Sequence, residues 1–326
     1  MNRRALEESA GPVIAGLVVL VTLILILGFA VRDPRPHDVP VGVVAPPSVA
    51  QQLTNGFAQA APGAFSFASY PSEAEARAAI DRREVVGAVL VGQGGPRLVV
   101  AAGAGEALSG GVTTAFTNAF QSQGTPLVVE AVHPMGSGDP HGIVLFFLVL
   151  STIVGSVIAG ALISVGAGNR SWAGSVAVLA TFAALSGTCG ALTAAWLANG
   201  YGDAIWLVMA LAGLLSLAVA AAVAAMGRLF GPAGIGLAAL VILPIGLISS
   251  GGPLGSEFLP DVYRAIAPWL PVAPAYSALR GALYFDGAGL AQPIALLAGW
   301  VLVAIALLAA PRLQHQANAG AELAHA

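Results

Sequence analysis

The chain has 326 residues, of which 57% are apolar and only 9% are charged. An ordinary soluble domain carries about 25% charged residues, so this composition excludes a soluble fold. All 13 basic residues are arginine and the net charge is −3, which excludes a basic surface for nucleic acid. Without lysine the chain also cannot hold a complete P-loop, which excludes an ATPase site within it. The single cysteine, Cys189, lies in an apolar stretch that predicts a buried thiol.

Uncharged apolar runs long enough to cross a bilayer, which takes about 20 helical residues, occur six times. They cover residues 11–31, 142–166, 172–197, 204–226, 232–250 and 290–310. None contains Asp, Glu, Arg or His, whereas an ion-driven carrier usually needs such a group inside the membrane. The sequence therefore predicts an α-helical multi-pass membrane protein with six transmembrane helices, and it disfavours a secondary transporter.

Arginine in the short connections predicts the orientation, because basic residues near helix ends stay on the cytoplasmic side. They stand at every second boundary, as Arg3 and Arg4, Arg170, Arg228 and Arg312. We therefore expect both termini, residues 1–10 and 311–326, in the cytoplasm of a cell that carries the protein in its plasma membrane. The first run has an alternative interpretation as a cleavable signal peptide, although it is longer than the usual signal core.

Residues 32–141, between the first two runs, carry more than half of the acidic residues and are expected outside the cytoplasm. Alternating patterns predict a small α/β domain. Its strands are expected at residues 39–45, 65–70, 85–91, 97–102 and 127–132, and its helices at 48–60, 72–83 and 106–121. Its histidines, His37, His133 and His141, match neither the HExxH nor the GxSxG pattern. We therefore predict no catalytic, cofactor or metal site, and no enzyme.

The segment 251–289, before the last run, is too hydrophobic for a free loop. Pro244 interrupts the fifth run, which ends in Ser249-Ser250-Gly251-Gly252, so the chain is expected to bend here. Two short helical pieces, 256–267 and 274–284, should follow. Irregular backbone at membrane depth needs cover from protein or a water-filled cavity, which favours a re-entrant hairpin entering from the outer face. An amphipathic surface loop is the alternative.

These residues also carry a resemblance. The spaced prolines Pro260, Pro268 and Pro271 and the closing Tyr276-Ser277-Ala278-Leu279-Arg280-Gly281 resemble the C-terminal part of the type-2 ABC exporter permeases. The chain is most similar to the branch that includes the phage-infection-protein membrane proteins, whose outer domain has segments like residues 39–44 and 72–80. The resemblance implies half of a transporter, working as a homodimer or paired half, with a separate ATP-binding subunit that docks from the cytoplasm.

The resemblance also implies roles for particular residues. The hinge and exit region would comprise Gly251, Gly252, Pro253, Pro268, Pro271, Tyr276 and Arg280, with Arg280 anchoring the re-entrant turn. A cytoplasmic coupling loop would contain Arg170, but the loop 166–171 is shorter than family members that couple to an ATPase usually have. The predicted function is a permease subunit that exports a hydrophobic or amphipathic molecule or envelope component. The alternative is an envelope protein that does not transport and whose outer domain is a receptor or scaffold.

Overall fold

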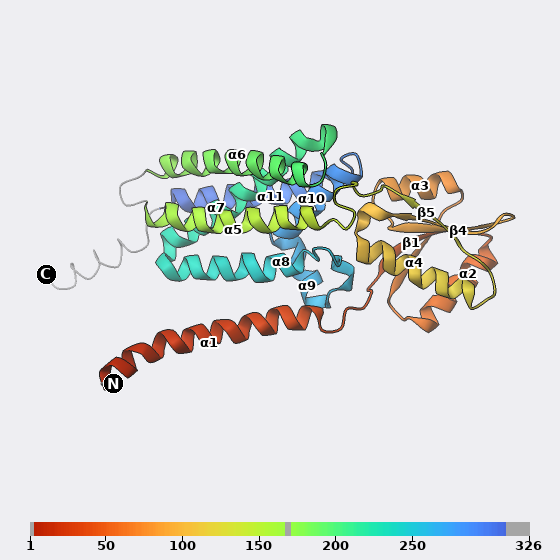
Figure 1. The fold of residues 1–326 in the computed structure, drawn as a ribbon, viewed down its shortest axis with the longest axis horizontal. Helices are drawn as coiled ribbons and strands as arrows, with labels where there is room; N and C mark the ends of the chain where they lie inside the picture. The colour runs from red at the N-terminus through yellow and green to blue at the C-terminus, as the bar shows by residue number, and fades with distance from the viewer. Residues whose placement is uncertain (1–2, 167–170, 311–326) are drawn as a thin grey trace.

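The computed structural model describes residues 3–166 and 171–310 and is mostly helical (69%). A helical bundle occupies one end of an elongated molecule, and an α/β domain occupies the other (Figure 1). Four segments within the described residues are long and apolar enough to cross a membrane. They are Ile143–Val165, Trp172–Leu197, Gly202–Ser249 and Ala291–Ala309. Residues 167–170, including Arg170, lie outside the described part, so the predicted coupling loop does too.

The bundle is formed by α5 (Ile143–Val165), α6 (Trp172–Leu197), α7 (Ile205–Leu240) and α11 (Ala291–Ala309). Its centre is α7, whose residues from Ala218 to Ala225 are all buried. Close packing depends on small side chains, because a Cβ added at Gly160 would lie 2.5 Å from the carbonyl oxygen of Ala220. The buried hydroxyls of Ser156 and Ser216 meet between α5 and α7 at 2.9 Å.

The 48-residue apolar segment that contains α7 is not one straight helix. Gly231 has φ 64° and ψ −147°, a backbone conformation available essentially only to glycine. A Cβ at Gly227 would lie 2.8 Å from Cγ1 of Ile235, a contact that two residues eight positions apart cannot make in a straight helix. The chain therefore turns back at Gly231, toward the α/β domain (Figure 1). This turn separates the two runs that were predicted as the fourth and fifth.

The returning stretch, which we call the return leg, covers residues 232–249. It continues through a π-helical turn, η3 (Val241–Gly246), and ends in α8 (Leu247–Ser249). Pro244 lies inside the π-helical turn, so the predicted interruption is present. The leg therefore ends close to the α/β domain, where the next segment begins.

The first helix, α1 (Arg3–Val31), runs beside the bundle and touches it mainly near its C-terminal end. There Ala30 is buried, and the hydroxyl of Tyr263 donates a hydrogen bond to the carbonyl oxygen of Ile26 at 2.7 Å. Upstream apolar side chains such as Leu17 and Ile24 are exposed. The first residues of α1 and the last of α11 lie at the end of the bundle away from the α/β domain (Figure 1).

The α/β domain is built on a five-stranded sheet in the order β2-β1-β3-β4-β5. The strands are β1 (Val39–Val44), β2 (Phe65–Ser69), β3 (Gly87–Gly92), β4 (Gly95–Ala101) and β5 (Val128–Val132). Only the β3–β4 pair is antiparallel, and its hairpin turn contains Gly92 and Gly95. Each predicted strand is present.

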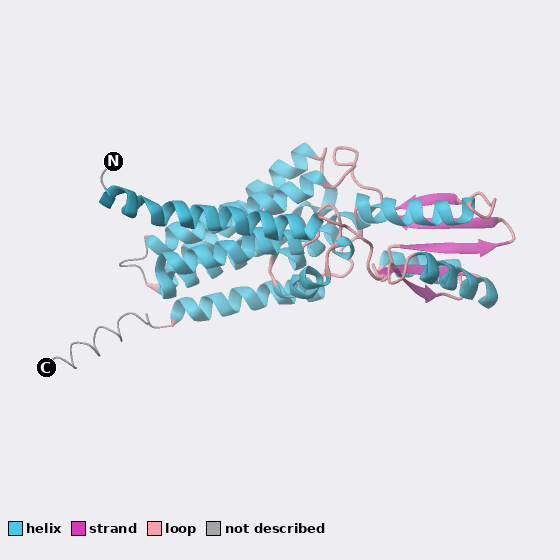
Figure 2. Ribbon diagram, turned by 90° about the horizontal axis from the view of Figure 1, so that it is seen from below, coloured by secondary structure: helices cyan, strands magenta, loops and turns pink. Residues whose placement is uncertain are grey.

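Helices cover both faces of this sheet (Figure 2). The helices α2 (Pro47–Ala60) and α4 (Glu106–Gln121) pack with Val41, Val89 and Leu98 on one face. On the other face, α3 (Glu73–Asp81) packs with Ala88, Leu90 and Val99. Successive strand residues thus point into two separate cores, as the twofold repeat of a strand requires. Phe285, from far along the chain, completes the second core.

The segment between the return leg and α11, which we call the platform, covers residues 251–289. It contains η4 (Ser256–Phe258), α9 (Asp261–Ile266), η5 (Ala267–Trp269) and α10 (Val272–Tyr284). The prediction of two short helical pieces is close to this result, with the first piece broken at Pro260. The platform lies between the bundle and the α/β domain (Figure 1).

Cys189 departs from its prediction, and Trp300 makes a contact between a bundle helix and the platform. Cys189 is exposed, so the predicted buried thiol is wrong. The buried side of α6 is the stripe Ala183, Gly187 and Ala191, and Cys189 lies two residues from Gly187, on the opposite side. Trp300 donates a hydrogen bond from Nε1 to the carbonyl oxygen of Trp269 at 3.0 Å and so joins α11 to the platform.

An ion-pair network on the α/β domain should make its stability depend on pH. Arg77 binds Glu130 with both terminal nitrogens, at 2.9 and 2.6 Å, and also pairs with Glu73. The pKa of Glu73 is lowered from its ordinary 4.5 by hydrogen bonds from Arg77 and Arg97, and that of Glu130 is lowered by Arg77. Because these pKa values are lowered in the folded state, the network stabilises the domain fully above pH 4.5 and is lost as the pH falls further.

We therefore expect the unfolding temperature of the full chain in detergent to fall as the pH drops below 4.5. The Arg77→Ala variant should show a shallower fall, because its carboxylates titrate nearer their ordinary values in both states. Arg35→Ala, which removes the separate exposed pair with Asp33, is the matched control. If the unfolding temperatures of wild type and Arg77→Ala fell in parallel with pH, the acid sensitivity would not arise from this ion-pair network.

Candidate functional site

The α/β domain rests directly on the platform. Gly103 lies so close to α10 that an added Cβ would stand 2.5 Å from Cβ of Tyr284. Phe285 is buried against the sheet and stacks with the ring of His133, with centroids 4.7 Å apart. The backbone N–H of His37 donates to the carbonyl oxygen of Glu257 at 2.9 Å. These contacts fix the domain to the platform and, through it, to one end of the bundle.

A cavity of about 500 Å³, which we call the junction cavity, lies within this contact region. The α/β domain contributes His37, Asp38 and Arg83 to its lining. Pro40 adds to this side, and the return leg, Ser250, the platform and α11 contribute the remainder. Among the charged side chains around it are three arginines and two carboxylates: Arg83, Arg264 and Arg280, with Asp38 and Glu257. Elements from both halves of the molecule thus enclose one polar site.

Arg83 reaches the cavity from the residue pair that follows α3. It has φ 62°, in the left-handed region where glycine is favoured, yet it carries a long side chain. Its guanidinium donates to the carbonyl oxygen and the hydroxyl of Ser277, each at 3.0 Å, and to the carbonyl oxygen of Ala288 at 3.3 Å. Burial, followed by the charge of Arg280, lowers the pKa of Arg83 to about 10. The guanidinium of Arg83 is therefore a half-buried cation, and its hydrogen-bond partners, Ser277 and Ala288, are neutral.

Arg280 comes from α10, one helical turn after Tyr276. Its guanidinium carbon lies 5.1 Å from the centroid of the Tyr276 ring, a cation–π arrangement. It also lies under Gly105 of the α/β domain, where an added Cβ would be 3.1 Å from Nη2. Within the described residues, neither Arg83 nor Arg280 has a carboxylate at ion-pair distance.

The other charged side chains of the cavity are engaged. Arg264 pairs with Asp38 at 3.2 Å and with Asp261 at 3.5 Å. Glu257 accepts a hydrogen bond from the hydroxyl of Ser256 at 3.1 Å. Among the residues that line the cavity, three arginines exceed two carboxylates by one positive charge.

Ser249, the last residue of α8, also lines the cavity. It is fully buried, and its hydroxyl has no hydrogen-bond partner among the described residues. A buried hydroxyl without a partner costs free energy, about 1–3 kcal/mol, and such a group in a native structure calls for an explanation.

The structure brings part of the predicted hinge and exit region together. Pro268, Tyr276 and Arg280 all line the junction cavity, and Pro253 borders a smaller cavity beneath Arg280. Pro271 is buried and precedes α10.

Gly251 and Gly252 form the turn after α8, with φ 74° and 45°. Both are buried, and a Cβ at Gly252 would lie 3.2 Å from the ring of Phe146. The bend that the sequence predicted is therefore present at these two glycines, although they do not line the junction cavity.

Sequence reasoning missed His37, Arg83, Ser249, Glu257 and Arg264 at this site. For Arg83 the sequence offered one signal. An arginine occupies the position just after a predicted helix, where glycine is usual. The others carry no signal, because the platform places them opposite residues more than 200 positions away, as in the contact of His37 with Glu257.

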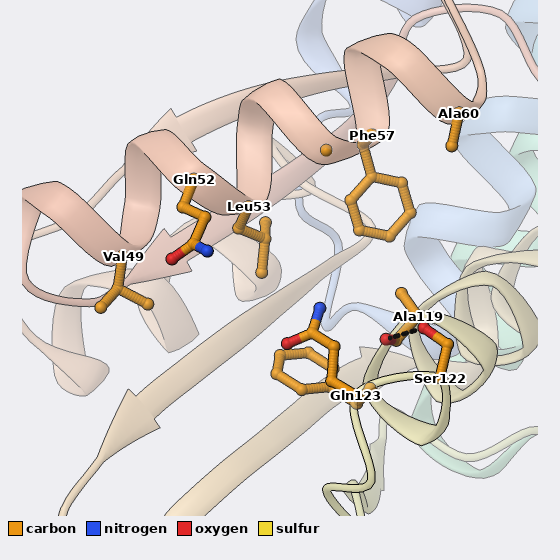
Figure 3. A pocket seen from close by; sticks show the side chains of 10 residues that line it. Val49, Gln52, Leu53, Phe57, Ala60, Ala119, Ser122 and Gln123 are labelled. Atoms are coloured by element: carbon orange, nitrogen blue, oxygen red, sulfur yellow. Dashed lines mark hydrogen bonds between the residues drawn. The ribbon is translucent and has the colours of Figure 1, made fainter.

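A second cavity, of about 280 Å³, lies within the α/β domain between α2 and the end of α4 (Figure 3). Leu53 and Phe57 of α2 face Ala119 and Gln123 across it. It is separate from the junction cavity and contains no charged side chain among its lining residues. A search of the described residues finds no cluster of His, Cys, Asp and Glu that could hold a metal ion.

No family model, curated protein or solved structure matches the chain. The resemblance to type-2 ABC exporter permeases therefore rests on the sequence pattern alone.

Proposed function

We propose that this protein is a membrane permease subunit that crosses the plasma membrane six times and exports an amphipathic molecule, as one of two copies served by a separate ATP-hydrolysing subunit. Its crossings would be α1, α5, α6, the first part of α7, the return leg and α11. The reversal at Gly231 supports counting the 48-residue segment as two crossings. With six crossings, the first and last helix ends share the cytoplasmic side, and the α/β domain lies outside.

The observation that carries the proposal is the placement of the junction cavity. Leu296 of α11 and Ser249 of the return leg belong to the bundle, while His37 and Arg83 belong to the α/β domain. A molecule that leaves the outer end of the bundle would thus meet a polar, partly charged chamber beneath the domain. Movement of the return leg would change this chamber, because the platform follows the leg along the chain and packs against the domain.

The energy source is argued from the bundle itself. Its buried polar side chains among the described residues are hydroxyls, such as Ser156 and Ser216, and the predicted spans contain no ionisable residue for a proton or sodium relay. An external ATPase is consistent with a chain that has no lysine for a P-loop.

The test is purification of the full chain from native membranes in mild detergent, followed by identification of any co-purifying P-loop ATPase and measurement of its stimulation. We expect stimulation by the wild type. Arg280→Ala should reduce this stimulation more than Arg97→Ala does. Arg97 pairs with Glu73, and neither residue lines the junction cavity. The exporter proposal is lost if no ATPase co-purifies and none is stimulated.

The cavity in Figure 3 favours a second candidate, a receptor or scaffold protein. It lies in the α/β domain and is lined by apolar and amide side chains from α2 and α4. If a chain lacking residues 39–132 kept full export, the receptor or scaffold proposal would be lost.

A further inference from the structure

Two guanidinium groups border the junction cavity without a neutralising partner. Arg83 is held by the oxygens of Ser277 and Ala288, which are neutral, and Arg280 lies over the Tyr276 ring. After burial, the charge of Arg280 lowers the pKa of Arg83, and the charge of Glu257 opposes this with a smaller effect. Two like charges in a half-buried site repel, and an anion between them would remove that cost.

We propose that the junction cavity binds a phosphate group, presented on an amphipathic molecule, between Arg83 and Arg280. Guanidinium forks bind phosphate by paired hydrogen bonds, and a phosphate has oxygens on several sides, so it can engage two forks at once. A carboxylate can also bridge two arginines, as Glu73 bridges Arg77 and Arg97 here, but its two oxygens lie in one plane and accept from fewer directions than those of a phosphate. Glu257 faces the same cavity but is not within ion-pair distance of either arginine, and the excess of one positive charge remains.

The cavity also lies at the level expected for lipid headgroups. Trp196, Trp206 and Trp269 are 79%, 75% and 74% exposed, at the outer ends of α6 and α7 and on the platform. Exposed tryptophans at helix ends mark a membrane interface. Pro268, beside Trp269, lines the cavity, and Pro293 and Leu296 of α11 add an apolar side that suits the first carbons of an acyl chain.

The inference concerns binding and holds whether or not the protein transports. The experiment titrates the full chain, in a non-ionic detergent, with dihexanoyl phosphatidic acid, with dihexanoylglycerol and with inorganic phosphate, and follows the unfolding temperature and the Kd. Phosphatidic acid should raise the unfolding temperature, and dihexanoylglycerol should not. Equal affinity for inorganic phosphate would identify a free phosphate as a sufficient ligand, whereas binding of phosphatidic acid alone would identify a lipid.

Arg280→Gln and Arg83→Gln should each weaken the Kd by about tenfold or more, and Arg280→Lys should weaken it less. Arg82→Gln is the matched control, since Arg82 adjoins Arg83 but is exposed and pairs with Glu84. Equal binding of phosphatidic acid and dihexanoylglycerol, or variants that bind like the wild type, would overturn the proposal. Whether or not an ATPase co-purifies with the chain, the conclusion from these binding measurements is unchanged.

Discussion

Replacement of Gly187 by leucine is expected to separate α6 from α7 and to prevent the bundle from assembling. A Cβ at this position would lie 2.6 Å from the backbone nitrogen and 2.8 Å from Cα of Gly213. Backbone atoms cannot move aside as the end of a flexible side chain can. The loss of stability should therefore reach or exceed the upper end of the about 1–3 kcal/mol typical of overpacked cores.

The measurement is the yield and the unfolding temperature of the purified full chain in detergent. Gly155→Leu in α5 is the control, because a Cβ at Gly155 meets no atom within 4 Å. Both variants add the same side chain to an apolar helix. If Gly187→Leu matched Gly155→Leu in yield and unfolding temperature, the close packing of α6 on α7 would be wrong.

Gly103→Leu should detach the α/β domain from the platform. An added Cβ would stand 2.5 Å from Cβ of Tyr284 and 3.1 Å from the carbonyl oxygen of His133. Neither atom lies at the end of a flexible chain, so the two surfaces must part. We expect the bundle and the domain to stay folded while the contacts between them are lost, because each has its own core.

Hydrogen–deuterium exchange on the full chain checks this result. Amides of residues 101–105 and 281–288 should exchange faster in Gly103→Leu, while those in the centre of α7 stay protected. Gly110→Leu on α4 is the control, since a Cβ there meets no atom within 4 Å. Unchanged exchange in residues 281–288 would show that the domain does not depend on this contact.

If the domain detaches, the junction cavity opens as well, because Arg83 on one side and Ser277 on the other form its wall. ATPase stimulation and phosphate binding should then both fall. The Gly103 variant thus tests whether the cavity needs both halves of the molecule, which the single arginine substitutions do not.

The local structure of this protein follows from its sequence. Apolar runs without charges predict the bundle helices, because a buried charge is costly in a bilayer and the backbone must satisfy its own hydrogen bonds. Alternation of strand and helix patterns predicts the α/β domain, and Ser72, whose hydroxyl accepts from the Glu75 amide at 3.3 Å, predicts the start of α3. Glycine and proline predict the bend after α8 at Gly251 and Gly252.

Only the tertiary structure decided where these pieces meet. The sequence separates the runs 204–226 and 232–250 at Arg228, but the position of the turn at Gly231 and the close approach of Gly227 to Ile235 are set by packing. Cys189 was predicted to be buried, but the buried side of α6 depends on which residues allow a close approach to α7. The junction cavity joins Arg83 to Ser277, 194 residues apart, and no local pattern carries such a contact. The burial and charge of this site arise because the α/β domain packs on the platform. The sequence therefore determined the helices and strands, and the packing between them determined the site.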